Sequence, residues 1–335
     1  MSKRIVKVGD LPFGDGNVYV QSMLNVSAQD VSGNVAQAMR LAEVGCDVIR
    51  VAVPDVRDVR LIDALKNAVS VPIVADIHFD YRIALEAVSA GADKIRINPG
   101  NIGDNERVKA VADACCNKGV PIRVGVNSGS VSGGLVESAI ANTRLLEALD
   151  FHDIVVSVKS SSVTNTIAAY RALAQAVPYP LHLGVTEAGT ARMGLIKSAI
   201  GIGALLCDNI GDTIRVSLTT TPHELEREVT AAQDILRAVG KRKGAQVVSC
   251  PTCGRCKIDV AGLAEQVETL LRGVDKPLKI AVMGCAVNGP GECKDADLGI
   301  TGGDGVGLVF RQGEIVKKVE ESQLMSALAE LINEL

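Results

Sequence analysis

Five cysteines near the carboxyl end of the chain are the residues whose types and spacing most clearly indicate chemistry. Three lie in SCPTCGRCKIDV, residues 249–260, at a C-x2-C-x2-C spacing, and two more lie in MGCAVNGPGEC, residues 283–293. They are Cys250, Cys253, Cys256, Cys285 and Cys293. Thiolates spaced in this way bind a metal ion or a metal cluster. We therefore predict a metal centre in this part of the chain.

Two kinds of metal centre compete for these thiols. A structural zinc site uses four thiolates, often from two C-x2-C pairs, but the second half here is a single Cys285 in a loop of glycine and proline, with Glu292 seven residues later. Iron–sulfur clusters accept such irregular loops because glycine lets backbone N–H groups approach the sulfur atoms. The pattern favours iron–sulfur over zinc. Spacing alone does not decide which thiols are ligands, and Cys256 competes with Cys285.

A second set of polar side chains lies within or at the carboxyl ends of short aliphatic segments in the first 240 residues. The set comprises Arg50, Asp76, His78, Arg96, Arg123, Asn127, Lys159, Glu187, Arg215 and Ser217. Unpaired cations are costly to bury. Five of these residues are cations, namely the four arginines and Lys159. Any one of the five could pair with a carboxylate such as Asp47, Asp93 or Asp212, but together they outnumber the inward carboxylates that we expect. Because arginine and lysine bind phosphate oxygens, the set predicts a site for a diphosphate.

Glu187 is the exception in this cationic set. Its carboxylate either neutralises an arginine or acts as a general acid or base beside the substrate. His78 alone does not indicate a function, because a histidine here could equally be a core residue or a residue that supports the side chains of the site.

The elements that must position these residues are strands that end at one edge. Eight aliphatic segments alternate with helical patterns such as residues 34–45 and 136–150. The predicted strands are residues 18–23, 48–53, 72–78, 94–100, 121–127, 153–159, 181–187 and 212–218. This alternation predicts βαβ units with a parallel sheet. Eight units in about 240 residues match a (β/α)8 barrel, whose chemistry lies at the carboxyl ends of the strands. A doubly wound open sheet is the alternative, but no glycine-rich phosphate loop follows the first strand.

The rest of the chain is predicted to form a second, small α+β domain. Residues 238–246, AVGKRKGAQ, are a basic break that contains glycine, so we expect a barrel over residues 1–240 and a cysteine-bearing domain over residues 241–335. The second domain should contain a helix near 262–272, strands over 278–284 and 296–303, a hairpin over 307–319 that turns at RQGE, and a carboxyl-terminal helix.

Composition narrows the classes of function. The 335 residues are 47% hydrophobic, with four tyrosines, four phenylalanines, no tryptophan and a net charge of −4, which argues against nucleic-acid binding. The chain shows no signal sequence and no run of about 18 apolar residues, so we expect a cytoplasmic protein that does not cross a membrane. Its thiols should then stay reduced. The other four cysteines, Cys46, Cys115, Cys116 and Cys207, should be small buried hydrophobic residues.

The segment SCPTCGR followed by MGCAVNGPGE closely resembles the bacterial 4-hydroxy-3-methylbut-2-enyl diphosphate synthases, and KIRINPGN, PIRVGVNSGS, GVTEAG, IGIGALL and GDTIRVSLT agree. The resemblance covers nearly the whole chain. It implies a TIM-type barrel followed by an iron–sulfur domain like the cluster domains of sulfite and nitrite reductases. It also implies reductive ring opening and dehydration of 2-C-methyl-D-erythritol 2,4-cyclodiphosphate to 4-hydroxy-3-methylbut-2-enyl diphosphate, in the non-mevalonate pathway of isoprenoid precursor biosynthesis. Two electrons would pass from flavodoxin or ferredoxin through a [4Fe-4S] cluster.

The resemblance assigns roles to residues of this sequence. Cluster ligands would be Cys250, Cys253, Cys285 and Glu292. Diphosphate contacts would be Arg50, Arg96, Arg123, Asn127, Lys159, Arg215 and Ser217. Glu187 would be the acid near the departing hydroxyl group, and Asp76 and His78 match a motif of the third strand. The family also implies a homodimer in which one subunit supplies the cluster domain to the barrel of the other.

Three residues depart from the family pattern. Cys256 and Cys293 stand where threonine and alanine are expected, and Asn209 stands where glycine is expected. Because asparagine tolerates positive φ, we expect a turn at Asn209. Two other functions stay open from the residues alone. An electron-transfer protein with a supporting barrel predicts four thiolate ligands, and a barrel enzyme with structural zinc predicts a colourless protein.

Overall fold

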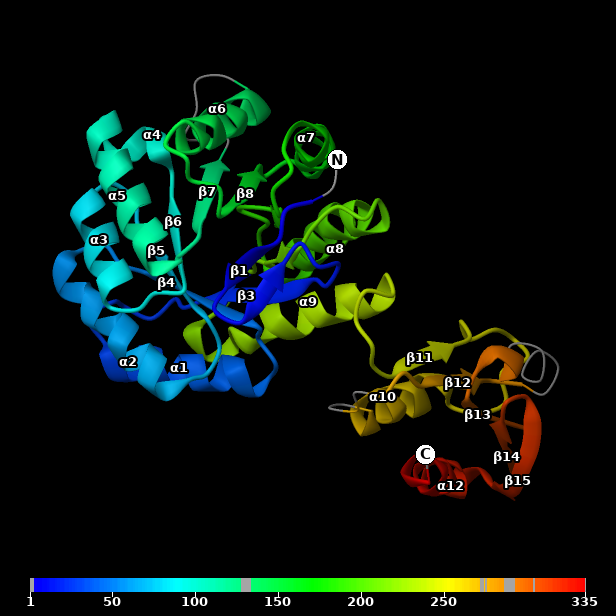
Figure 1. Cartoon of the computed structure of the whole chain (residues 1–335). Coiled ribbons are helices and arrows are strands. Elements are labelled where there is room, and N and C mark those ends of the chain that lie inside the picture. Colours follow the sequence, from blue (N-terminus) through cyan, green and yellow to red (C-terminus); the bar gives the residue numbers. More distant parts are fainter. Residues whose placement is uncertain are drawn as a thin grey trace. The chain divides into compact units, whose positions relative to one another are not determined.

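The computed structural model of the chain describes residues 3–127, 134–271, 274, 276–285, 293–303 and 305–334, without the side chains of Asn127 and Cys293. The chain divides into two compact units, Met1–Lys241 and Arg242–Leu335, which Figure 1 shows in blue to yellow-green and in yellow to red. None of the helices in the described ranges is long and apolar enough to cross a membrane.

The first unit is built on eight parallel strands. They are β3 (Tyr19–Met23), β4 (Val48–Ala52), β5 (Ile73–Asp76), β6 (Lys94–Ile97), β7 (Ile122–Asn127), β8 (Ile154–Lys159), β9 (His182–Leu183) and β10 (Thr213–Ile214). Their order is β8-β7-β6-β5-β4-β3-β10-β9, and an isolated parallel bridge between Val156 and Leu181 brings β9 back to β8. The sheet is therefore a nearly closed barrel. The predicted barrel is confirmed, and the doubly wound alternative is wrong.

Helices cover the outside of this barrel (Figure 1). The longer ones are α1 (Val31–Glu43), α2 (Arg60–Ala68), α3 (Tyr81–Ser89), α5 (Asn105–Lys118), α6 (Leu135–Glu147), α7 (Val163–Ala176), α8 (Ala191–Cys207) and α9 (Glu226–Ala238). Short turns are α4 (Pro99–Ile102), η1 (Val56–Val59) and η3 (Pro222–Glu224). Side-chain caps begin several helices, as where Asp30 accepts the N–H of Gly33. After α8, Asn209 has φ of 57°, so the expected positive-φ turn is confirmed.

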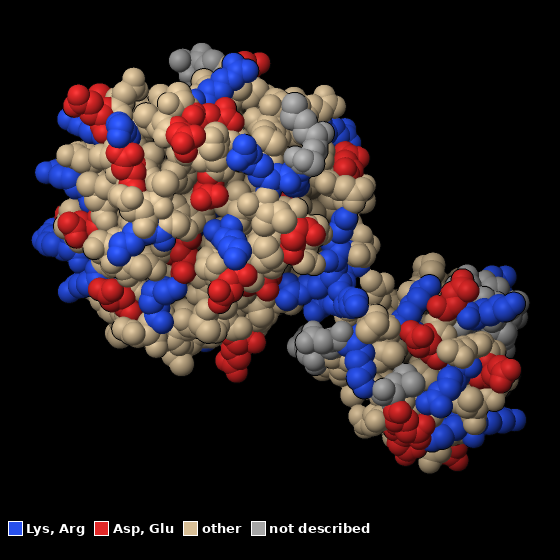
Figure 2. Space-filling view, in the orientation of Figure 1, with Lys and Arg blue, Asp and Glu red and all other residues tan. Residues whose placement is uncertain are grey.

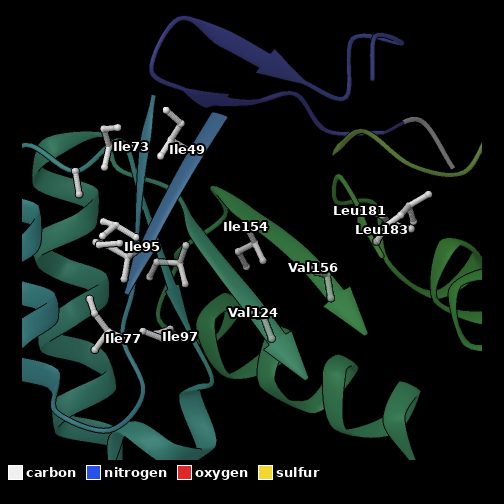
Figure 3. Packing of buried hydrophobic residues seen from close by; sticks show 14 of the residues in the cluster. Ile49, Ile73, Ile77, Ile95, Ile97, Val124, Ile154, Val156, Leu181 and Leu183 are labelled. Atoms are coloured by element: carbon white, nitrogen blue, oxygen red, sulfur yellow. The ribbon is translucent and has the colours of Figure 1, made fainter. Parts of the chain in front are cut away.

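The core of the barrel unit lies between the strands and the helices. Figure 3 shows aliphatic side chains such as Ile49, Ile95 and Val124 in this layer, and all three are fully buried in the main hydrophobic cluster. Because side chains alternate along a strand, the neighbours of these residues point into the barrel. Arg50 and Arg123 are such neighbours. The outward aliphatic face therefore fixes the inward direction of the cations.

An amino-terminal hairpin, which was not predicted from the sequence, closes the other end of the barrel. The hairpin consists of β1 (Val6–Val8) and β2 (Leu11–Phe13), paired antiparallel. Its apolar side chains pack with Val48, Val74 and Val155, which lie at or near the amino ends of their strands. The strand ends that carry the predicted site are at the opposite mouth.

The second unit is an α+β domain, as predicted. Its sheet has the order β11 (Gln246–Ser249), β12 (Lys279–Met283), β13 (Leu298–Gly303), β14 (Val306–Arg311) and β15 (Glu314–Glu320). The first three strands are parallel and the last three antiparallel. Residues of α10 (Val260–Leu270) and α12 (Leu324–Asn333) form one cluster with β12 and β13. The chain also has short η4 (Cys293–Asp295) and η5 (Glu321–Gln323).

Two predictions about this domain have different outcomes. The hairpin does turn within RQGE, where Gln312 and Gly313 have φ of 50° and 83°, as a two-residue turn between antiparallel strands requires. Strand β11, which lies just before Cys250, was not predicted. The likeness to the cluster domains of sulfite and nitrite reductases stays a prediction.

Candidate active site

Five cations converge inside the carboxyl-terminal mouth of the barrel. They are Arg50 on β4, Arg96 on β6, Arg123 on β7, Lys159 on β8 and Arg215 just after β10. The first four residues have relative exposures of 9%, 7%, 1% and 8%, and the Arg215 side chain is 18% exposed. On the face of the barrel shown in Figure 2, by contrast, surface cations and carboxylates are interspersed. The predicted strand-end cations are thus brought together in one buried place.

Asp76 links two of these arginines. Its Oδ2 atom lies 2.5 Å from Nη2 of Arg50, and its Oδ1 atom lies 3.2 Å from Nη1 of Arg96. His78, about half exposed, places Nε2 3.4 Å from Oδ2. Burial raises the pKa of Asp76, but Arg50, a hydrogen bond from His78 and Arg96 outweigh it and hold this pKa well below its usual value. Asp76 is therefore a charged carboxylate that orients two guanidinium groups.

Glu228 is a residue of the site that sequence reasoning missed. It lies on α9, is 3% exposed, and places Oε2 3.6 Å from Nη2 of Arg215. Its other oxygen accepts the backbone N–H of Leu218 at 2.8 Å. Burial raises the pKa of Glu228, although Arg215 opposes this effect. The signal available in the sequence was a glutamate at core spacing between Leu225 and Ala232 of an amphipathic helix.

The carboxylates named as possible partners have other contacts. Asp212 pairs with Lys3 and Asp93 with Lys66, each at 2.7 Å, and Asp47 accepts the backbone N–H of Val20 at 2.7 Å. The expectation that the strand-end cations exceed their carboxylates holds, but Asp76 and Glu228 are the partners that we find.

Arg123 differs from the other three arginines of the site, because two of its guanidinium nitrogens, and not one, lack a hydrogen-bond partner among the described atoms. Within the described part of the chain, its Nε and Nη1 atoms have no hydrogen-bond partner. Burial, and then repulsion from Arg50 and Arg96, lowers the pKa of Arg123 well below its usual value. A bound anion would relieve both effects, because it supplies acceptors and negative charge.

Lys159 contacts a second residue that the sequence reasoning missed. Its Nζ atom lies 3.3 Å from Nε2 of His182 on β9, and His182 is fully buried. Two glycines, Gly184 and Gly125, leave room for the side chains of Lys159 and Arg96. A Cβ atom at Gly184 would lie 2.9 Å from Nζ of Lys159, and one at Gly125 would lie 2.6 Å from Nε of Arg96.

The remaining predicted residues lie at the same mouth with fewer contacts. Asn127 ends β7 in register with Lys159, and its side chain is outside the described atoms. Ser217 is half-buried after β10. Glu187 is exposed in the segment after β9 and has φ of 51°, a left-handed conformation that costs energy for a non-glycine residue. Among the described residues, no hydrogen bond or ion pair joins Glu187 to the cations.

Cysteines of the second unit gather at the carboxyl ends of two parallel strands. Cys250 follows β11 and Cys285 follows shortly after β12, and the N–H of Cys250 donates to the carbonyl of Val282 at 3.2 Å. The N–H of Gly284 donates to Sγ of Cys250 at 3.3 Å. Sγ of Cys256 also lies against Gly284, where a Cβ atom would be only 2.4 Å away.

Other parts of the predicted metal centre are less complete. Cys253 is exposed. Glu292 lies outside the described residues, as does the side chain of Cys293. Across the ranges that the structure describes, no three His, Cys, Asp or Glu residues are placed to hold a metal ion. Of the four barrel cysteines, Cys46 and Cys115 are buried as expected, but Cys116 and Cys207 are exposed, so that expectation is wrong for two.

The fold and the site define a TIM-barrel protein with a buried, cation-lined mouth and a separate thiol-bearing α+β domain. The chain belongs to the GcpE family: the GcpE TIM-barrel domain matches residues 3–233, and the GcpE protein C-terminal domain matches residues 246–334. The family membership expected from the motifs is confirmed.

Relatives cover nearly the whole chain. A protein of Fusobacterium nucleatum is 51% identical over 345 residues, and one of Caldanaerobacter subterraneus is 52% identical over 346 residues. Each match covers 99% of this chain and 97% of the relative, and both relatives are named 4-hydroxy-3-methylbut-2-en-1-yl diphosphate synthase (flavodoxin). Among solved structures, dihydropteroate synthase from Yersinia pestis is similar with a TM-score of 0.53 at 14% identity, over 70% of this chain and 98% of that one. This likeness concerns the barrel fold alone.

Proposed function

We propose that this chain catalyses the reductive ring opening of 2-C-methyl-D-erythritol 2,4-cyclodiphosphate to 4-hydroxy-3-methylbut-2-enyl diphosphate. The reaction takes up two electrons and protons and releases water, and it produces an isoprenoid precursor. The observation that carries the proposal is the gathering of five largely buried cations at the mouth of the barrel, of which only three pair with a carboxylate, Asp76 or Glu228, among the described residues. The names of relatives about half identical over nearly the full length support the same reaction.

The barrel, residues 1–240, would bind the diphosphate. Arg50 and Arg96, oriented by Asp76, and Arg215, oriented by Glu228, would donate to phosphate oxygens. Arg123 supplies donors that have no protein partner among the described atoms. Lys159, Asn127 and Ser217 would complete the contacts. Preorganised cations of this kind also stabilise negative charge that develops on a diphosphate when its bond to carbon breaks.

Glu187 would donate the proton with which the departing hydroxyl group leaves as water. Its left-handed backbone supports a functional role, because a strained conformation persists only where the surroundings impose it. The N–H of the preceding Thr186 donates to the carbonyl of Ser160 at 3.3 Å, which ties this segment to the end of β8 beside Lys159.

The second unit, residues 241–335, would bind a [4Fe-4S] cluster through Cys250, Cys253, Cys285 and Glu292. The donors fit such a group: thiols follow the carboxyl ends of β11 and β12, and a backbone N–H of Gly284 already points at Sγ of Cys250, as cluster sulfur atoms favour. When bound, the cluster would supply electrons one at a time. Glu292 differs from the three thiols because a carboxylate is a harder and more exchangeable ligand.

Two partners complete the proposal. The relatives' names support flavodoxin as electron donor, and ferredoxin is the alternative. We also propose a homodimer in which the cluster domain of one subunit serves the barrel of the other. Helix α8 supports self-association, because Met193, Ile196 and Ile200 share one face and are 42%, 40% and 54% exposed.

The proposal is tested on protein purified and reconstituted without oxygen. We expect a brown protein with about four irons per chain and matching sulfide, and conversion of the cyclic diphosphate when reduced flavodoxin is added. A colourless protein with one bound zinc would remove the cluster from the proposal. A brown protein that leaves the cyclic diphosphate unchanged with every reductant would remove the reaction.

A further inference from the structure

We propose that His182 is a positioning residue for Lys159: its imidazole accepts one N–H of the ammonium group and holds that group, charged, at the anion-binding mouth. The inference deepens the proposed function, because it rests on Lys159 as a ligand of the diphosphate. None of the motifs that identify the family in this sequence includes a role for His182.

The contacts of the imidazole determine its hydrogen positions. Nε2 of His182 lies 3.3 Å from Nζ of Lys159, and Nδ1 lies 2.5 Å from Oγ1 of Thr213. With Lys159 in the ammonium form that we propose, Nε2 is the acceptor, because an ammonium group only donates hydrogen bonds. The ring hydrogen is then on Nδ1 and is donated to Thr213. His182 therefore acts as a neutral imidazole with one defined tautomer.

The backbone of His182 is fixed to the strand that carries Lys159. The hydroxyl of Tyr170, on α7, donates to the carbonyl of His182 and accepts the N–H of Val158 at 3.2 Å. Between β8 and β9 the barrel has only the single bridge from Val156 to Leu181. The buried Tyr170 thus joins the two strands at the level of the Lys159–His182 contact, and the imidazole cannot move far from the amine.

The neighbouring residues also limit the place of the amine. Gly184 directly follows β9, two residues after His182, and a Cβ atom there would lie 2.9 Å from Nζ of Lys159 and 2.8 Å from the carbonyl oxygen of Arg215. Only glycine leaves this space open. The ammonium group is therefore held over β9, with one hydrogen directed to His182 and two available for an anion.

The charges around this pair explain why an acceptor is needed. Arg123 of β7, Arg215 after β10, Arg50 of β4 and Arg96 of β6 all act on Lys159, and Lys94 of β6 also acts on His182. Glu228 of α9 is the carboxylate that acts on Lys159 in the opposite sense. Burial and then these cations lower the pKa of Lys159 and of His182. A neutral imidazole opposes the loss of the proton from Lys159, because it bonds to the charged form.

The experiment compares His182→Leu with His182→Gln in the full-length chain. Glutamine keeps an acceptor near the place of Nε2, and leucine does not. Inorganic pyrophosphate is titrated by calorimetry at a series of pH values, and the acetylation rate of Lys159 by acetic anhydride is read by mass spectrometry over the same series. For His182→Leu we expect pyrophosphate affinity about tenfold weaker near neutral pH. Lys159 should also become reactive at lower pH, while His182→Gln should remain close to the unsubstituted chain.

A purely structural role of His182 predicts a different result. Both variants would then lose thermal stability, with no change in the pH at which Lys159 becomes reactive, and that result overturns the inference. If His182→Leu does not fold, Thr213→Val removes the acceptor of the Nδ1 hydrogen instead. The reactivity of Lys159 should shift in the same direction, and an unchanged profile in Thr213→Val also overturns the inference. These measurements need neither cluster nor turnover, so they separate a failure of this inference from a failure of the proposed reaction.

Discussion

Arg50 and Asp76 form a buried ion pair in which Nη2 lies 2.5 Å from Oδ2, and the second oxygen of Asp76 lies 3.2 Å from Nη1 of Arg96. One carboxylate on β5 therefore holds two guanidinium groups from the strands on either side, β4 and β6. The arrangement leaves both arginines with N–H groups that do not contact Asp76. Asp76 fixes their direction without using all of their donors.

Asp76→Asn is expected to destabilise the barrel by about 3–5 kcal/mol, because it leaves two buried cations without their carboxylate. Urea unfolding at neutral pH measures the change. Asp55→Asn is the matched control, since Asp55 pairs with Arg57 on the surface and its loss should change the free energy of unfolding little. Equal effects of the two substitutions would contradict the assignment of Asp76 as the counter-charge.

The effect of Asp76 should depend on pH in one direction. Its pKa in the folded chain is well below the usual value, so its contribution to stability is present above the ordinary aspartate pKa of about 3.9. The contribution is lost as the pH falls through the lower folded-state pKa. The difference in stability between the unsubstituted chain and Asp76→Asn should therefore be constant above about pH 5 and should shrink in more acidic solution.

Arg123→Met should weaken pyrophosphate binding about 10- to 100-fold without lowering the free energy of unfolding. The guanidinium of Arg123 is fully buried and lacks a carboxylate partner in the described part of the barrel, so its removal takes away an uncompensated charge. Lys94→Met is the matched control. Lys94 is another fully buried cation, but its Nζ lies 4.4 Å above the ring of Phe13 in the closing hairpin. Loss of stability with unchanged pyrophosphate affinity in Arg123→Met would count against the anion site.

The barrel was predictable because its outward residues are regular. Aliphatic residues at alternate positions of β4, β6 and β7 mark the helix-facing side, and the cations between them must point inward. The hairpin of β1 and β2 escaped prediction because each strand has three residues, too few for a period to show. Strand β11 escaped for a similar reason, since its four residues are mostly exposed.

The site was predictable only where it lies at strand ends. The expectation that functional residues lie at the carboxyl ends of barrel strands identified the five cations. It could not identify Glu228, which reaches the site from a helix, or His182, which resembles an ordinary core residue. It also named wrong carboxylate partners. Pairing depends on which strands are neighbours and on their register, and Asp76 meets Arg96 because the two are register partners. A single sequence does not contain that information directly.

The cysteine variants should separate ligands from neighbouring thiols. Cys250→Ser, Cys253→Ser and Cys285→Ser should each lose most of the iron after anaerobic reconstitution, whereas Cys116→Ser, an exposed cysteine of the barrel, should not. Cys256→Ser is the informative case, because Sγ of Cys256 lies against Gly284. We expect it to retain the cluster. Loss of iron in Cys256→Ser together with retention in Cys285→Ser would assign the ligand role to Cys256 instead.

Glu187→Gln should retain the cluster and pyrophosphate binding while turnover falls about 100-fold or more, as expected for loss of a general acid. Iron content, calorimetry and the rate of product formation are measured on one preparation. Glu106→Gln, an exposed glutamate of α5, is the control and should be fully active. Loss of the cluster or of pyrophosphate binding in Glu187→Gln would show that the residue has a different role.

Mixing two inactive variants tests whether the cluster domain acts across subunits. Lys159→Ala removes a cation of the barrel and Cys250→Ser removes a proposed cluster ligand, so each proposed homodimer alone should be inactive. In a mixed dimer, the intact barrel of the Cys250→Ser chain would meet the intact cluster domain of the Lys159→Ala chain. Random exchange of subunits should then restore about a quarter of the activity of the unsubstituted dimer, because half of the dimers are mixed and each has one complete site.

The control mixes Lys159→Ala with Arg50→Ala, both of which damage the barrel, and it should restore nothing. If each cluster domain served the barrel of its own chain, the first mixture would also stay inactive, since neither chain carries both intact parts. If the cluster domain of one subunit serves the barrel of the other, the mixture of Lys159→Ala with Cys250→Ser must be active and the control mixture must be inactive. Inactivity in both, with mixed dimers demonstrated by mass spectrometry, would assign the barrel and the cluster domain of one reaction site to the same chain.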